Sequence, residues 1–221
     1  MKLLAEALIK FACGLLMVSL LIFLPAGTLR YTYGWLLIGL LFVPMLIAGF
    51  VMLHKSPDFL KKRLDVKEKQ GTQKGVVAFS GLMFIAGFVV AGLDFRFGWS
   101  QVPAWAVITA SVLFLAAYAM YAEVMRENAY LSRTIQVEEG QRVVDTGLYG
   151  IVRHPMYAVT ILLFLMIPLV LGSWYALIVF ACYPAIIIIR LKDEEKLLTK
   201  ELSGYTEYKQ KVKYRLFPFV W

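Results

Sequence analysis

Long runs of apolar residues constrain this chain more than any other feature. Four of them, at about 11–27, 33–53, 75–93 and 103–122, are each close to the roughly 20 residues that a helix needs to cross a bilayer core. A fifth apolar block covers about 158–189. With 60% apolar and 17% charged residues, the chain is far more hydrophobic than a soluble domain. The sequence therefore predicts an all-α fold, a multi-pass transmembrane helical bundle.

The block at 158–189 is too long for one crossing. As a single helix it would extend about 48 Å, whereas a bilayer core is about 30 Å thick. Gly172-Ser173-Trp174 lies near its middle and predicts a turn, and we expect Pro168 and Pro184 to bend the two arms. The block is thus expected to form a helical hairpin with short arms, which brings the total to about six membrane helices.

Basic residues are distributed unevenly along the chain, whose net charge is +8. They cluster in 54–74, in 126–153 and after residue 189, whereas the other loops carry only Arg30 and Arg96. This is the pattern that the positive-inside rule predicts if both termini are cytoplasmic. We therefore interpret the charge as a mark of topology and not of nucleic-acid binding, and expect a multi-pass protein of a bacterial inner membrane.

Few residues suggest metal or transport chemistry. Cys13 and Cys182 are far apart in apolar segments, so we expect neither a disulfide framework nor a metal site. The ionisable residues Lys10, Asp94 and Glu123 lie toward segment ends, which disfavours a transport path through the membrane. The sequence also contains no G-x-G-x-x-G, the phosphate-binding fingerprint of soluble dinucleotide-binding domains.

The order of segments predicts two parts. Residues 1–123 would form an N-terminal four-helix membrane region with a basic cytoplasmic loop at 54–74, and residues 124–221 a catalytic region made of a polar loop, the hairpin and a charged tail helix. On a continuous helix Arg190 and Glu194 share one face because they are four residues apart.

Arg153-His154-Pro155 and Arg190 bracket the hairpin. Each stretch has a simple structural interpretation, as headgroup-level polar residues or as an exposed ion pair. If the hairpin returns to the cytoplasmic side, however, His154 and Arg190 end near the same interface, with polar loops above and lipid below. That location suits a reaction between a water-soluble reagent and a lipid-tailed substrate.

Four ordered motifs make the second part specific. They are TGLYGIVRHPMY at 146–157, the hairpin, RLKDEEKLL at 190–198 and GYTEYKQKVKYRLFPFVW at 204–221. Together they resemble the isoprenylcysteine carboxyl methyltransferase family, especially its bacterial members, over about residues 124–221. Two positions depart from the family pattern: Ala158 replaces a small Gly, and Leu202-Ser203-Gly204 replaces a Phe-Gly step.

The resemblance implies an S-adenosyl-L-methionine-dependent methyltransferase with a cytoplasmic cofactor pocket and a prenylated cysteine carboxylate as acceptor. Arg190 matches the position that the family assigns to the substrate. The cofactor-binding positions that the resemblance implies are Gln136, Gln141, Arg142, Val143, Val144, Tyr149, His154, Pro155, Met156, Tyr157 and Glu194.

The physical chemistry of methyl transfer is compatible with these residues. A carboxylate is already ionised near pH 7, so no general base is required, and the protein must mainly align donor and acceptor. The Arg190 guanidinium is suited to holding a carboxylate through two charge-assisted hydrogen bonds. His154 is therefore expected in the wall of the cofactor pocket and not as a catalytic base.

Three other functions stay open at this point. A phospholipid amine could replace the carboxylate as acceptor, with Arg190 on the lipid phosphate. A membrane reductase using NADPH is a second alternative, because an Arg-His-Pro-x-Tyr motif also occurs in sterol-reductase-like proteins. A non-catalytic membrane protein is the third.

Overall fold

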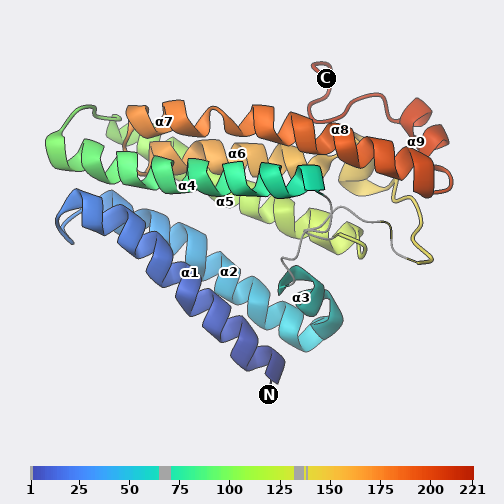
Figure 1. Cartoon of the computed structure of the whole chain (residues 1–221), viewed down its shortest axis with the longest axis horizontal. Helices are drawn as coiled ribbons and strands as arrows, with labels where there is room; N and C mark the ends of the chain where they lie inside the picture. The colour runs from blue at the N-terminus through green and yellow to red at the C-terminus, as the bar shows by residue number, and fades with distance from the viewer. Residues whose placement is uncertain (1, 65–70, 132–136, 138) are drawn as a thin grey trace.

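The computed structural model describes residues 2–64, 71–131, 137 and 139–221, and these ranges contain helices and no strand (Figure 1). The helices are α1 (Lys2–Ala26), α2 (Thr32–Lys55), α3 (Pro57–Leu64), α4 (Gly71–Phe97), α5 (Ala104–Glu127), the short 3-10 helix η1 (Gly147–Gly150), α6 (Pro155–Val170), α7 (Trp174–Phe180), α8 (Tyr183–Glu201) and α9 (Tyr205–Lys211).

Five helical stretches in the described residues are long and apolar enough to cross a membrane. They are α1, α2, α4 from Gln73, α5, and α7 together with α8. Their outer faces carry large exposed apolar side chains, among them Leu24, Trp105 and Ile178. Such faces suit lipid and not water. The prediction of an all-helical, multi-pass membrane protein is thus confirmed at this level.

The hairpin is present, and its first arm is short. Helix α6 has 16 residues, which is about 24 Å and less than a bilayer core. Gly172 makes the turn with a positive φ of 75°, and the Ser173 side chain caps α7 by accepting from the Ala176 amide at 3.0 Å. The second arm is broken between α7 and α8, and Pro184 lies in the first turn of α8, where a missing N–H costs no hydrogen bond.

The end of the bundle that holds the hairpin turn is tied together by polar side chains. The buried Asp94 carboxylate accepts from the Ser100 amide at 2.7 Å, from the Ser100 hydroxyl at 2.6 Å and from the Ser173 hydroxyl. The Tyr31 hydroxyl donates to the Leu171 carbonyl in the same region. We call this end, formed by Tyr31, Asp94, Ser100, Leu171 and Ser173, the closed end.

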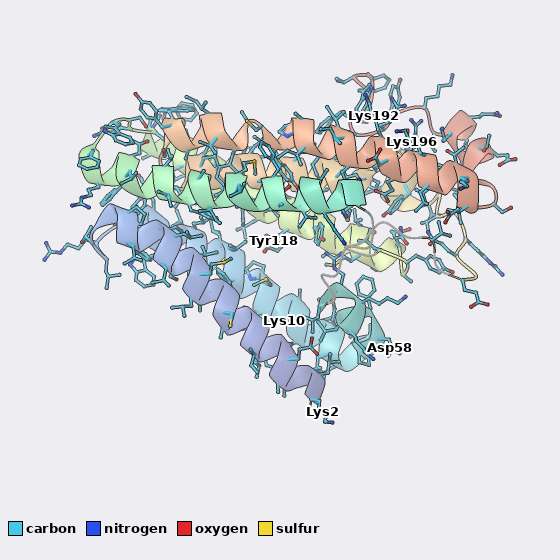
Figure 2. The ribbon with its side chains drawn as sticks, viewed as in Figure 1. Lys2, Lys10, Asp58, Tyr118, Lys192 and Lys196 are labelled. Carbon is cyan, nitrogen blue, oxygen red and sulfur yellow. The ribbon has the colours of Figure 1, made fainter. Side chains whose placement is uncertain are left out.

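Helices α1 and α2 lie against the other helices near the closed end and diverge from them toward the N-terminus (Figure 1). Close packing near the closed end needs small residues: a Cβ on Gly92 would come 2.6 Å from the Ile22 carbonyl oxygen, and a Cβ on Gly87 2.3 Å from Phe180. Lys2 and Lys10 mark the diverging end, and Lys192 and Lys196 lie on α8 away from the closed end (Figure 2).

Candidate functional site

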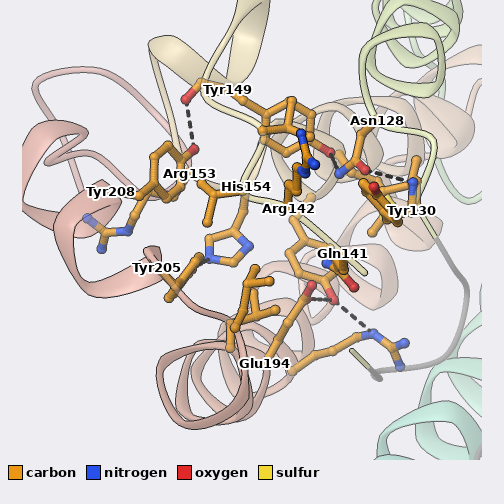
Figure 3. A pocket seen from close by; sticks show the side chains of 18 residues that line it. Asn128, Tyr130, Gln141, Arg142, Tyr149, Arg153, His154, Glu194, Tyr205 and Tyr208 are labelled. Carbon is orange, nitrogen blue, oxygen red and sulfur yellow. Dashed lines mark hydrogen bonds between the residues drawn. The ribbon is translucent and has the colours of Figure 1, made fainter. Parts of the chain in front are cut away.

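A pocket lies at the end of α6 and α8 opposite the closed end, and Figure 3 shows its labelled side chains converging from several segments. Ten of the predicted site residues line it: Gln141, Arg142, Val143, Val144, Tyr149, His154, Met156, Tyr157, Arg190 and Glu194. Gln136 lies outside the described residues. Residues from the polar loop, the motif and the tail helix, far apart in the sequence, are therefore brought together as the hairpin prediction requires.

Tyr157, Arg190 and Glu194 form one hydrogen-bonded group at the pocket. The Tyr157 hydroxyl donates to the Glu194 carboxylate and accepts from Nε of Arg190 at 3.1 Å. Arg190 and Glu194 face the same side of α8 because four residues are about one helical turn. A neutral hydroxyl thus stands between a cation and an anion, and orients both toward the motif helix α6.

Glu195, the neighbour of Glu194, has a different role that the sequence does not distinguish. Its carboxylate is 5% exposed and accepts from Nε of Arg153 at 2.7 Å and from Nε of Arg215 at 3.0 Å. Nε2 of His154 lies 3.4 Å from the same carboxylate. Successive helical residues are about 100° apart around the axis, so Glu194 faces the pocket while Glu195 enters the buried network behind it.

Arg153 fastens the C-terminal tail to the motif. Its guanidinium donates to the carbonyls of Val212 and Lys213 at 2.8 and 2.9 Å, and its amide donates to the Tyr214 carbonyl at 2.9 Å. The His154 amide adds a bond to the Arg215 carbonyl at 2.9 Å. The Arg153 side chain is buried, and the tail carbonyls and the Glu195 carboxylate accept its hydrogen bonds, so it holds the tail on the motif.

Three tyrosines form the remaining polar wall. The Tyr149 hydroxyl accepts from the side-chain amide of Asn128 at 3.0 Å. The Tyr208 hydroxyl donates to the Tyr149 carbonyl at 2.7 Å, and the Tyr205 hydroxyl lies 3.4 Å from Nε2 of His154. Burial raises the pKa of all three phenols, so these hydroxyls stay protonated at neutral pH. Asn128, Tyr205 and Tyr208 were not among the predicted site residues.

An apolar groove runs along the other side of α6. Pro155 and Ala158 line it together with Met120 of α5 and residues 216–218 of the tail. Pro155, expected at the cofactor, therefore lies in the groove wall, while its neighbours His154 and Met156 line the pocket. The motif helix thus separates a polar pocket from an apolar groove.

The chemistry of the pocket is that of charged, aromatic and apolar side chains. In the described part of the chain, no cluster of three or more His, Cys, Asp or Glu side chains could hold a metal ion. The pocket combines the Glu194 carboxylate, the Arg142 and Arg190 guanidinium groups, the Tyr149 and Tyr205 rings and the apolar Leu198 and Leu202. Such a mixture fits a small zwitterionic molecule with a flat ring system better than a purely apolar one.

Comparisons with known proteins agree with the motifs. Residues 105–200 match the family model described as "Isoprenylcysteine carboxyl methyltransferase (ICMT) family". A curated protein of Bacillus subtilis (strain 168), named uncharacterized protein YpbQ, is 26% identical over 165 residues, which are 74% of this chain and 95% of that protein. The matched segment begins earlier than the motifs suggest, because it includes most of α5, and ends before the tail.

Proposed function

We propose, from the match of residues 105–200 to the isoprenylcysteine carboxyl methyltransferase family, that this chain is an integral membrane methyltransferase using S-adenosyl-L-methionine. Its acceptor would be a lipophilic molecule, and the reaction carboxyl O-methylation of an isoprenylcysteine-like substrate. The observation that carries the proposal is the position of Tyr157, Arg190 and Glu194 in one hydrogen-bonded group that lines a polar pocket on the motif helix.

The pocket residues fit the donor. S-adenosyl-L-methionine supplies a methyl group on a cationic sulfonium, next to an ammonium group, a carboxylate and an adenine ring. Glu194 offers a carboxylate to the cationic groups, and the electron-rich faces of Tyr149 and Tyr205 suit a sulfonium. Val143, Val144 and Leu202 supply apolar surface for a ring. The backbone amide of His154 is hydrogen-bonded to the Arg215 carbonyl of the tail, and its side chain would form part of the pocket wall.

Arg190 supports a carboxylate as acceptor. A guanidinium attracts an anion through charge-assisted hydrogen bonds and repels an ammonium group. The apolar groove on the far side of α6 offers lipid-compatible surface next to the motif. Because an ionised carboxylate is already nucleophilic, the protein needs to orient it, exclude water and keep the methyl donor in line, and no side chain has to remove a proton.

The proposed orientation places the pocket end and both termini in the cytoplasm, where the methyl donor is available. The short α6 would leave the motif at the level of the headgroups, so a lipid-tailed acceptor could reach the pocket from the inner leaflet. In this arrangement α6 and the α7–α8 arm form a fifth and a sixth membrane helix. Residues 1–123 would then serve as the membrane region and 124–221 as the catalytic region.

Methyl transfer to a defined probe tests the proposal. The purified full chain is incubated with methyl-labelled S-adenosyl-L-methionine and N-acetyl-S-farnesylcysteine, and the labelled product is treated with base. We expect label that base releases as methanol, because an ester is base-labile. If the label were found instead in a base-stable lipid amine, the acceptor would be a phospholipid amine and not a carboxylate.

Ligand-dependent stabilisation separates the proposal from a reductase. A ligand present at a hundredfold excess over its Kd stabilises the folded state by about 2.7 kcal/mol, which raises the melting temperature. We expect S-adenosyl-L-methionine to raise it and NADPH to leave it unchanged. Stabilisation by NADPH alone would contradict the proposal, and stabilisation by neither would favour a non-catalytic protein.

A further inference from the structure

Gln73 connects the N-terminal half of the chain to the proposed acceptor site. It lies near the start of α4, and its side chain is 0% exposed. The amide oxygen accepts from Nη1 of Arg190 at 3.3 Å, and the amide nitrogen donates to the Asp193 carboxylate at 3.1 Å. Both partners belong to α8, so one buried amide bridges two oppositely charged side chains of a single helix.

The chemistry of its partners fixes how the amide is oriented. A guanidinium can only donate and a carboxylate can only accept, so the oxygen must face Arg190 and the nitrogen Asp193. Burial of an amide without partners would destabilise the fold, and both ends of this amide are hydrogen-bonded. Gln73 is therefore held in one orientation between the two charges.

The bridge separates charges that could otherwise pair directly. Arg190 and Asp193 are three residues apart on α8, a spacing at which opposite charges commonly form an ion pair. Tyr157 plays the equivalent part on the other side, because its hydroxyl lies between Arg190 and Glu194. Two neutral groups thus stand between one guanidinium and two carboxylates.

We propose that Gln73 is a positioning residue for the acceptor: it holds the Arg190 guanidinium in place and keeps Asp193 from pairing with it. The inference rests on the proposed function, because it concerns the grip of Arg190 on an acceptor carboxylate. The segment that matches the family model runs from residue 105 to residue 200, so Gln73 lies outside it. A side chain of α4 therefore sets how strongly the α8 arginine binds its substrate.

The test combines Gln73→Ala with Asp193→Asn. In Gln73→Ala the Asp193 carboxylate can pair with Arg190 and compete with the acceptor for one charge-assisted hydrogen bond. The KM for N-acetyl-S-farnesylcysteine is therefore expected to rise about tenfold. The affinity for S-adenosylhomocysteine, measured by calorimetry, should change by less than about twofold. In the double variant the competing charge is gone, and the KM should return to within about threefold of the wild type.

Two further variants control for folding. Gln73→Glu keeps the shape of the side chain but places a carboxylate against Arg190, so it should also raise the KM while the melting temperature shows a folded protein. Gln101→Ala, an exposed glutamine near the closed end, should behave as the wild type. Recovery on adding Asp193→Asn is the readout that a merely structural glutamine would not give.

The outcomes distinguish the two proposals. A wild type that forms no ester from the probe would overturn the proposed function and this inference with it. A wild type that forms ester, with an unchanged KM in Gln73→Ala, would overturn the inference alone. A raised KM that Asp193→Asn does not lower would also overturn it, because the loss would then come from packing and not from the competing charge.

Discussion

On the proposed function, Arg190 is the residue on which the choice of acceptor depends. Replacing it with alanine removes the guanidinium that Tyr157 and Gln73 contact, so the proposed acceptor carboxylate would lose a charge-assisted contact of about 1.5–3 kcal/mol. We expect kcat/KM for N-acetyl-S-farnesylcysteine to fall about tenfold to a hundredfold. Lys200→Ala, at an exposed position near the end of the same helix, is the control and should leave the activity unchanged. Equal losses in both variants would contradict a specific role for Arg190.

Glu194 and Glu195 are neighbours with separable effects. Glu194→Gln removes the pocket carboxylate, and we expect weaker binding of S-adenosyl-L-methionine with a melting temperature close to that of the wild type. Glu195→Gln leaves Arg153 and Arg215 without their buried anion, and the loss of one partner from such a network costs about 3–5 kcal/mol. Its melting temperature should fall clearly, whereas that of Glu201→Gln, an exposed position on α8, should not.

Residue-level roles were predictable only where periodicity or a motif decides them. The pairing of Arg190 with Glu194 on one face follows from helical spacing, and their approach to His154 follows from the hairpin. Helical spacing and the family resemblance both favoured Glu194 for the pocket, but neither predicted the buried contacts of Glu195, because these depend on how α8 packs against the motif and the tail. Gln73 carried no signal, since a lone glutamine near a basic loop resembles any surface residue.

At the scale of elements, the tail from Val212 to Arg215 depends on Arg153. Arg153→Met keeps an apolar side chain of similar length but removes the ion pair and two bonds to tail carbonyls. We expect the tail to open more often, which trypsin would detect as faster cleavage after Lys213 in the folded protein. Arg126→Met, whose side chain is 69% exposed, is the matched control and should not change the cleavage rate.

The helices themselves were predictable, and the tail was not. The apolar runs locate the membrane helices, although α1 begins well before its run and includes the exposed pair Glu6 and Lys10, which are 2.6 Å apart. The tail binds the motif through backbone carbonyls, and any sequence can offer these. A non-local pairing of this kind leaves no pattern in the residues that make it, so the sequence did not predict the buried contacts of Arg153 with the tail.

At the scale of the whole molecule, the orientation in the membrane can be measured. In a background of Cys13→Ala and Cys182→Ala, single cysteines are introduced as Arg30→Cys, near the closed end, and Gln210→Cys, on α9. On the proposed orientation, a membrane-impermeant maleimide should label only Arg30→Cys in cells with a permeable outer envelope and an intact inner membrane. Labelling of Gln210→Cys before lysis would reverse the orientation.

The hydrogen bonds around Asp94 bear on the route by which the proposed enzyme would take up its acceptor and release its product. Ser100 and Ser173 hold the loop after α4 to the hairpin turn, and Tyr31 adds the turn between α1 and α2. Hydrogen bonds join the helices at this end, whereas α1 and α2 diverge from the others at the opposite end (Figure 1). On the proposed orientation, a lipid-tailed acceptor would enter from the inner leaflet and its methylated product would return there. The chemistry would thus change the charge of a lipid-anchored group without carrying it across the bilayer, and no energy source beyond the methyl donor would be required.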